Sequence, residues 1–194
     1  MPTIANPLMD PHVSWHLPLD ELERRLALLS APDNRGVVEL IVSRSDDGTR
    51  QTPARVALAP GMGVPGDRWS RGNTPRPDAE ITVMRADVAR LVGNGQPLTT
   101  AGDNLLVHLD LSSANLPAGT RLRAGTALLE VTPLPHTGCA KFAARFGKAA
   151  LKLTADPRFR HLRLRGIHVK IVTAGELAPG DVIEVVDRRN ADSG

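Results

Sequence analysis

The residue with the clearest chemical potential is Cys139, the only cysteine among 194 residues. Pro135 and Gly138 break the strand-like run that precedes it, and Phe142 and Phe146 then recur at helical spacing. We therefore expect Cys139 at a loop-to-helix junction. In that position the unpaired N–H groups and the positive end of the helix dipole favour thiolate over thiol.

Positive charge surrounds this cysteine in the sequence. Lys141 and Arg145 follow it at short spacing, and His136 precedes it. A lone cysteine also has a simpler interpretation as an inert, buried small hydrophobic residue. The glycine-preceded, cation-flanked setting favours a reactive thiol, which would act as a nucleophile or as a ligand to a soft metal.

Basic residues are concentrated after the cysteine. Residues 141–170 hold nine Lys and Arg and one Asp, a net charge of +8 in a chain whose formal charge is +3. Such a segment is either a solvated basic face or a seat for an anionic ligand, for example a phosphate-bearing cofactor. The basic residues concerned are Lys141, Arg145, Lys148, Lys152, Arg158, Arg160, Arg163, Arg165 and Lys170.

Two glycine-bounded loops each contain a Gly-Asp step. The first spans residues 61–72 and carries Asp67 and Arg68, and the second spans residues 101–107 and carries Asp103 and Asn104. Each step is explained by a turn, since Gly adopts positive φ and Asp or Asn bonds its own backbone. The alternative is that these four polar residues converge with Cys139 at one end of a barrel.

The elements that would position these residues are mainly strands. Eight short apolar runs, separated by Gly and Pro, predict an all-β barrel or sandwich. The clearest alternation is Ile167, Val169 and Ile171 against His168 and Lys170, which predicts a half-buried strand. The runs span residues 36–43, 54–60, 79–84, 104–111, 120–125, 127–133, 166–172 and 181–187, with a hairpin turn at 45–48.

A few helices accompany the strands. One is predicted over residues 18–30, with leucines along one stripe, a second over 85–92, and a third over 139–154 with a break at Gly147. The expected organisation is an N-terminal extension with one amphipathic helix (1–35), a β-barrel domain (36–186) and a disordered tail (187–194).

Composition excludes several classes of function. No apolar run reaches 18 residues and the N-terminus lacks the layout of a secretory signal, which favours a cytoplasmic protein without membrane spans. One thiol cannot build a structural zinc site. Aromatic residues make up 3% with no Tyr, which disfavours recognition of nucleic acid by stacking. No phosphate-binding loop or serine-hydrolase motif occurs.

Six segments, taken in order, resemble the MOSC domain, named for the C-terminal domain of molybdenum cofactor sulfurase. No single segment is specific, but their order and the position of the cysteine make a strong combined signal over residues 36–186. The segments are VPGDRW (64–69), GDNLLV (102–107), LPAGTRLRAGTALLEVTP (116–133), PHTGCAKF (135–142), RGIHVKI (165–171) and GELAPGDVIEV (175–185).

The resemblance implies a MOSC-type β-barrel in which Cys139 carries sulfur or contacts the molybdenum of a molybdopterin cofactor. It also implies that Asp67 and Arg68 match the family's GDR step, and that Asp103 and Asn104 match its GEN-like step. Two positions depart from the family pattern. Trp69 stands where His is common, which removes a possible ligand, and Gly138 stands where Pro usually precedes the cysteine.

We therefore expect a protein that binds molybdenum cofactor or handles its sulfur through Cys139, with reduction of N-hydroxylated compounds as one reaction that the resemblance implies. Lys141, Arg145 and Arg165 would bind the cofactor's phosphate, and Asp67, Arg68, Asp103 and Asn104 would line the pocket. We expect no pyridoxal phosphate site, since the residues before the barrel are too few for a desulfurase domain.

Two alternatives remain open. One is a non-redox carrier that accepts a persulfide from a separate desulfurase, and the other is a non-catalytic binding protein with an inert cysteine. The expected partners are a desulfurase or an electron-transfer protein, together with a small-molecule substrate.

Overall fold

All eight predicted strand runs form strands in the computed structural model, which describes residues 15–71 and 75–188. Three further short strands, β2, β3 and β10, complete the set in the described part of the chain. The strands are β1 (Arg35–Ile41), β2 (Ser43–Arg44), β3 (Arg50–Gln51), β4 (Val56–Leu58), β5 (Ile81–Arg85), β6 (Leu105–His108), β7 (Arg121–Ala124), β8 (Ala127–Pro135), β9 (Ile167–Thr173), β10 (Gly175–Leu177) and β11 (Val182–Asp187).

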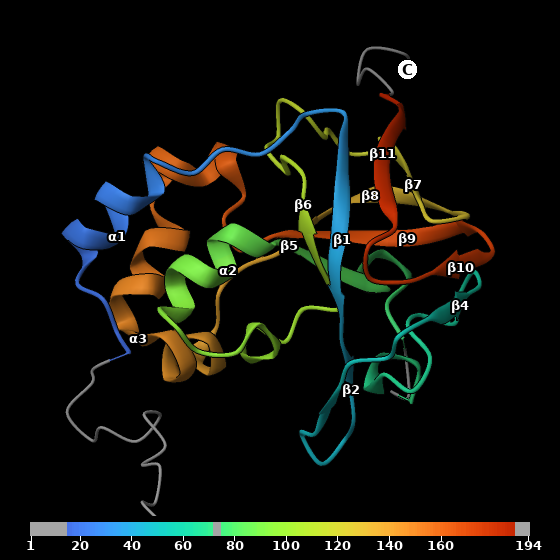
Figure 1. Cartoon of the computed structure of the whole chain (residues 1–194), viewed down its shortest axis with the longest axis horizontal. Coiled ribbons are helices and arrows are strands. Elements are labelled where there is room, and N and C mark those ends of the chain that lie inside the picture. Colours follow the sequence, from blue (N-terminus) through green and yellow to red (C-terminus); the bar gives the residue numbers. More distant parts are fainter. Residues whose placement is uncertain (1–14, 72–74, 189–194) are drawn as a thin grey trace, which may run out of the picture.

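Helices cover one side of the strands, as Figure 1 shows. The α-helices described are α1 (Leu19–Leu26), α2 (Ala86–Gly93) and α3 (Ala140–Ala155). Short 3-10 turns lie at η1 (Arg68–Arg71), η2 (Pro77–Ala79), η3 (Leu98–Thr100) and η4 (Pro157–Leu162).

Seven of the described strands close into a barrel in the order β1-β11-β7-β8-β9-β5-β6, with β6 pairing back onto β1. Neighbouring strands run antiparallel except β5 and β6, which are parallel. A parallel pair needs a crossover connection, and α2 supplies it between the two strands. Closure removes the exposed strand edges that an open sheet would leave.

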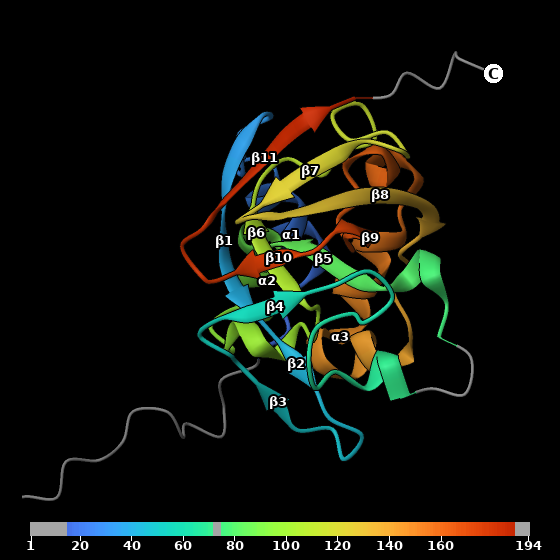
Figure 2. The same ribbon diagram turned by 90° about the vertical axis from the view of Figure 1, so that its right-hand side faces the viewer.

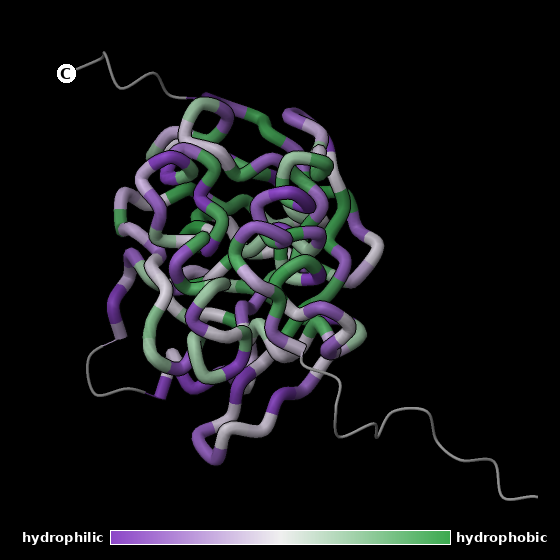
Figure 3. The backbone as a smooth tube through the Cα atoms, turned by 90° about the vertical axis from the view of Figure 1, so that its left-hand side faces the viewer, coloured by the Kyte–Doolittle hydropathy of each residue, from purple (hydrophilic) through white to green (hydrophobic). Residues whose placement is uncertain are grey.

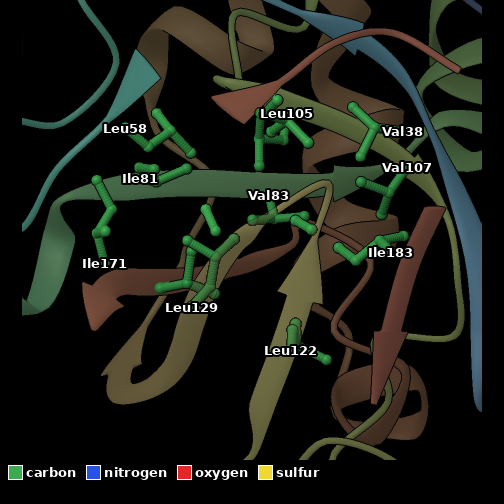
Figure 4. Close-up of a cluster of buried hydrophobic side chains, with 14 of the residues drawn as sticks. Val38, Leu58, Ile81, Val83, Leu105, Val107, Leu122, Leu129, Ile171 and Ile183 are labelled. Carbon is green, nitrogen blue, oxygen red and sulfur yellow. The ribbon is translucent and has the colours of Figure 1, made fainter. Parts of the chain in front are cut away.

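Two apolar clusters stabilise this arrangement. The first fills the barrel with alternate residues of its strands, among them Val83, Leu105 and Ile171 (Figure 4). The second lies between the helices and the outer face of the barrel, where Met84 and Leu106 meet residues of α1, α2 and α3. Burial on both faces explains why β5 is buried along its whole length.

The helical side alternates between hydrophilic and hydrophobic stretches along the chain (Figure 3), as expected of amphipathic helices. The predicted first helix is shorter than expected. Pro18 is its N-cap rather than its first helical residue, and the helix ends at Leu26, not at Ser30. Its last turn is of the 3-10 type: the N–H groups of Leu28 and Leu29 donate hydrogen bonds to carbonyls three residues earlier.

The other helices follow the prediction closely. Asn94, in the left-handed conformation with φ 43°, ends α2 one residue after the predicted glycine stop. Gly147 breaks α3 as expected, with φ 87°. The prediction of a half-buried β9 was partly wrong, because His168 is buried as well. The centroids of the His136 and His168 rings lie 4.5 Å apart.

The β2–β3 hairpin projects beyond one end of the barrel (Figures 1 and 2). Its turn is the predicted one, closed by bonds from Ser45 N–H to Thr49 O and from Gly48 N–H to Ser45 O. Gly48 has φ +88°, which favours glycine at this position. The hairpin carries Arg44 and Arg50 toward the cysteine-bearing end of α3.

The expected division into extension, barrel domain and tail stays a prediction. Residues 1–14 and 189–194 of the proposed extension and tail lie outside the described residues. Among those that are described, no helix is both long enough and apolar enough to span a bilayer.

Candidate functional site

Cys139 is the N-cap of α3 and is exposed. Its carbonyl accepts hydrogen bonds from the N–H groups of Phe142 and Ala143, at 2.9 and 3.1 Å, which begin the helix. The pKa of the thiol is lowered from its usual value, chiefly by the backbone N–H of Phe142 and further by that of Lys141 and the charges of Arg165 and Arg145, while partial burial opposes the shift. The predicted loop-to-helix position and its electrostatic consequence are therefore present.

A pocket of about 120 Å³ lies beside this thiol. Basic side chains dominate its wall, and no acidic side chain is among the described residues that line it. The lining residues, basic and non-basic, come from the β2–β3 hairpin, from η1, from the loop before β6, from α3 and from the turn before β9. The basic lining residues are Arg44, Arg50, Arg68, Lys141, Arg145 and Arg165.

Arg44 is held by a buried polar network. Its Nε and Nη2 donate to the two carboxylate oxygens of Asp67, at 2.8 and 3.0 Å, and Nη2 also donates to Asn104 Oδ1 at 3.0 Å. Asn104 Nδ2 returns a bond to Asp67 Oδ2 at 2.9 Å. Burial alone would raise the pKa of Asp67, but the Arg44 guanidinium lowers it below its usual value.

Asn104 also links strand β5 to the residue between β1 and β2. Its Oδ1 accepts bonds from the N–H and hydroxyl of Thr82 on β5, at 3.1 and 3.0 Å, and its Nδ2 donates to Val42 O at 3.1 Å. Asn104 is 1% exposed, and these bonds occupy both ends of its amide inside the protein.

Arg165 is held by a second buried carboxylate. Its Nη1 lies 2.9 and 2.8 Å from the two oxygens of Asp103, and its guanidinium packs over the Phe142 ring at 5.0 Å from the centroid. Burial raises the pKa of Asp103, and the charge of Arg165 opposes the rise. His136 Nδ1 is 3.6 Å from Asp103 Oδ1, and burial lowers the pKa of His136 to about 2, so the imidazole is neutral.

The remaining cations of the pocket have no such neutralising partner. Arg50, Arg68, Lys141 and Arg145 form no ion pair with a carboxylate in the described part of the chain. Burial, and repulsion from Arg68 and Arg44, lower the pKa of Arg50. Burial and repulsion from Arg50 and Arg165 lower that of Arg145. Uncompensated, partly desolvated cations are the electrostatic signature of an anion site.

A glycine permits the close approach of two of these cations. Gly102 has φ +73°, and a Cβ atom placed on it would lie 3.0 Å from Arg145 Nη1 and 3.5 Å from Arg50 Nε. Arg145 Nη1 donates to the carbonyl of Ala101 at 3.3 Å. The guanidinium groups therefore pack directly against the backbone of the loop.

The structure sorts the predicted site residues into two groups. Cys139, Arg68, Lys141, Arg145 and Arg165 line the pocket. The other three, Asp67, Asp103 and Asn104, are buried behind the lining residues, where they hold Arg44 and Arg165 in place. Any contact of these three with a cofactor stays a prediction.

Sequence reasoning missed Arg44 and Arg50. Both lie outside the basic segment, although the predicted hairpin turn at 45–48 places them on its two arms, and they pair across the strands. The basic segment itself is dispersed: Arg158 bonds to Glu23 and Asp156, and Lys170 pairs with Glu130. Among the described residues, no group of three or more His, Cys, Asp or Glu is placed to hold a metal.

The fold and the site define a small closed β-barrel that presents one thiol within a cationic pocket. The family model of the MOSC domain matches residues 79–184, more than half of the chain, and the chain therefore belongs to the MOSC domain family. No curated protein matches the sequence.

Three solved structures resemble this fold at 19% identity, a level that shows the fold alone. A hypothetical protein covers 79% of this chain and 69% of its own, with a TM-score of 0.57. YuaD from Bacillus subtilis covers 78% of this chain and 95% of its own, with a TM-score of 0.53. YiiM from Escherichia coli covers 78% and 71%, with a TM-score of 0.50.

Proposed function

We propose that this protein binds molybdenum cofactor, with the phosphate of the pterin in the cationic pocket and the Cys139 thiolate as the sulfur ligand to molybdenum. The observation that carries the proposal is the placement of one acidified thiol and six cations around the same pocket. MOSC domains are associated with this cofactor, and membership of that family supports the choice of ligand.

The residues present fit such a ligand. A volume of about 120 Å³ suits a phosphate-sized group, and guanidinium forks give charge-assisted bonds to phosphate oxygens. A thiolate is a soft donor of the kind that molybdenum accepts. When bound, the cofactor would supply a redox-active metal, and the reaction we propose for it is the reduction of N-hydroxylated compounds.

The protein's own contribution is to hold charge and geometry. Arg50 and Arg145 would bind the phosphate, because neither is neutralised by a described carboxylate. Arg165 and the Phe142 N–H stabilise negative charge on Cys139 Sγ. Asp103 positions Arg165, and it does so from a buried site that a ligand in the pocket does not reach. An electron-transfer protein would be the required partner.

The exposure of Cys139 favours a second candidate function, that of a sulfur carrier. In this reaction the thiolate attacks the terminal sulfur of a persulfide on a desulfurase partner. A new S–S bond forms on Cys139, the donor's S–S bond breaks, and the donor cysteine leaves as a thiolate. Either role requires a reduced thiol, and we propose a cytoplasmic setting for that reason.

The test is to purify the protein from a host that makes molybdenum cofactor and to measure bound molybdenum and pterin. We expect stoichiometric metal in the wild type and its loss in Cys139→Ala. Arg145→Gln and Arg50→Gln should each reduce retained pterin by about tenfold, the effect of losing one charge-assisted contact. Lys148→Gln, which removes an exposed charge from the same helix, is the matched control.

Each outcome has a definite meaning. A persulfide adduct on Cys139 in intact mass spectra, without molybdenum, would support the carrier and contradict the cofactor proposal. Absence of both, together with a thiol that iodoacetamide alkylates no faster than free cysteine, would contradict both candidates and leave the inert cysteine.

A further inference from the structure

A second, larger pocket of about 820 Å³ adjoins the loop that carries Cys139. Gly138 lines this pocket while Cys139 lines the cationic one, and Arg165 lines both. Its volume lies within the range of small-molecule sites, which is about 300–1,000 Å³. The functions proposed above do not use it.

Irregular strand pairing opens one wall of this pocket. Strand β8 pairs with β9 at Val131 and Val169, and pairing resumes only at Pro135 and Ile167. Three residues of β8 therefore stand opposite one residue of β9, and two prolines in this stretch, Pro133 and Pro135, have no N–H to donate. The regular ladder is interrupted along this stretch as a result.

The opposite wall is fixed by backbone conformation. Arg163 is in the left-handed region with φ 48°, and its Nη1 donates to the carbonyl of Leu116 at 2.6 Å. Gly166 has φ +100°, and a Cβ atom there would lie 2.1 Å from the carbonyl oxygen of Val83. The backbone at Gly166 thus packs directly against strand β5, and the Arg163 side chain is bonded to the loop at Leu116.

The lining combines an apolar surface with uncompensated positive charge. Arg160 and Arg163 contribute cations, and burial lowers the pKa of Arg163. Arg165 is neutralised by Asp103 through Nη1, but its Nε is buried without a hydrogen-bond partner in the described structure. No acidic side chain is among the described residues that line the pocket. Its apolar surface comes from Pro133, Leu134, Pro135, Pro157, Leu164 and Ile167.

These observations select a ligand class. Proline and leucine walls suit a flat or compact hydrocarbon ring, and guanidinium groups without carboxylate partners attract an anionic group. We propose that this pocket is a separate binding site for a small amphipathic organic anion, such as an aromatic carboxylate. The inference stands apart from the proposed cofactor, because its charge comes from Arg160 and Arg163, which line this pocket and not the phosphate-sized one.

The probe is 2-naphthoate, titrated into the full-length protein by calorimetry, with uncharged 2-naphthylmethanol as the comparison. We expect the carboxylate to bind at least about tenfold more tightly than the alcohol, because only the carboxylate engages the guanidinium groups. Amide NMR shifts should change over residues 154–167 rather than over 44–50. Equal affinity for both compounds, or no binding, would overturn the proposal.

Two variants locate the site. Ala155→Trp places a large ring at an exposed wall position and should weaken naphthoate binding at least about tenfold, while Arg160→Gln should weaken it about threefold. Lys152→Gln removes an exposed charge outside the pocket and Arg50→Gln a charge of the cationic pocket; both should leave affinity within about twofold.

Circular dichroism of each variant is the check that it is folded. Since Ala155 and Arg160 are exposed, neither substitution disturbs the core. A loss of binding in Arg50→Gln with none in Arg160→Gln would place the anion in the cationic pocket and sink the proposal. The result is independent of molybdenum, so failure here leaves the proposed function untouched.

Discussion

At the scale of single residues, the groups placed around Cys139 lower the pKa of its thiol. N–H groups of the first helical turn and two guanidinium groups each stabilise the thiolate form. Asp103 has a different role, since it is buried and contacts Arg165 rather than the pocket. Asp103 and Arg165, two residues of opposite charge, thus act together on the Cys139 thiol.

We expect the rate of Cys139 alkylation by iodoacetamide to reach half its maximum at a pH below that of free cysteine, because the pKa of the thiol is lowered. Arg145→Gln removes one stabilising charge and should shift this midpoint upward. The control is Lys148→Gln, which should leave the midpoint in place. A midpoint at the free-cysteine value in the wild type would show that the thiol is not activated.

At the scale of elements, η1 with Arg68 and the loop before β6 line the pocket together with three further segments. The β2–β3 hairpin supplies Arg44 and Arg50, α3 begins at Cys139 and presents Lys141 and Arg145, and the turn before β9 supplies Arg165. Helix α1 packs against α3 through Leu22 and Leu26, within the apolar cluster on the outer face of the barrel. Its support is therefore indirect, since it holds the helix that bears the site.

We expect Leu22→Ala to lower the free energy of unfolding by about 3 kcal/mol, because the substitution leaves a cavity where a fully buried leucine side chain packed. Leu28→Ala is the matched control, since Leu28 is 75% exposed and its loss should cost less than about 0.5 kcal/mol. Urea denaturation of both variants makes the measurement. Equal stability of the two would mean that α1 does not pack on α3 in solution.

At the scale of the whole molecule, closure of the barrel buries charged groups that must be paired. Asp67 and Arg44 form such a pair, with Asp67 1% exposed. The pKa of Asp67 is lower in the folded protein than its usual value. Its ionised form therefore stabilises the fold above the unfolded pKa of about 3.9, and this contribution is lost as the pH falls through the native pKa.

We expect Asp67→Asn to be about 3 kcal/mol less stable than the wild type at pH 7, since one partner of a buried ion pair is removed. The difference should shrink as the pH falls below about 4, because the wild-type carboxyl then becomes neutral as well. Urea unfolding across pH 3 to 7 measures it. A difference that stays constant with pH would show that the Asp67 charge contributes nothing.

The fold was largely predictable from the sequence. Strand runs such as residues 104–111 alternate or stay apolar over short lengths between Gly and Pro, and these local signals indicated a β-barrel. The position of Cys139 at the start of a helix was equally local. The first helix was predicted too long, because the tightening of its last turn after Leu26 leaves no trace in the spacing of leucines.

The site was predictable in part. By itself the sequence determined the candidate residues, since a lone cysteine, a basic segment and two Gly-Asp steps are visible without coordinates. Only the tertiary structure decided that Asp67, Asp103 and Asn104 hold arginines from behind the pocket, and that Arg44 and Arg50 face Cys139. The physical reason is distance along the chain: the fold brings together residues more than a hundred positions apart, such as Arg44 and Arg165. No local pattern encodes which of two polar neighbours turns inward.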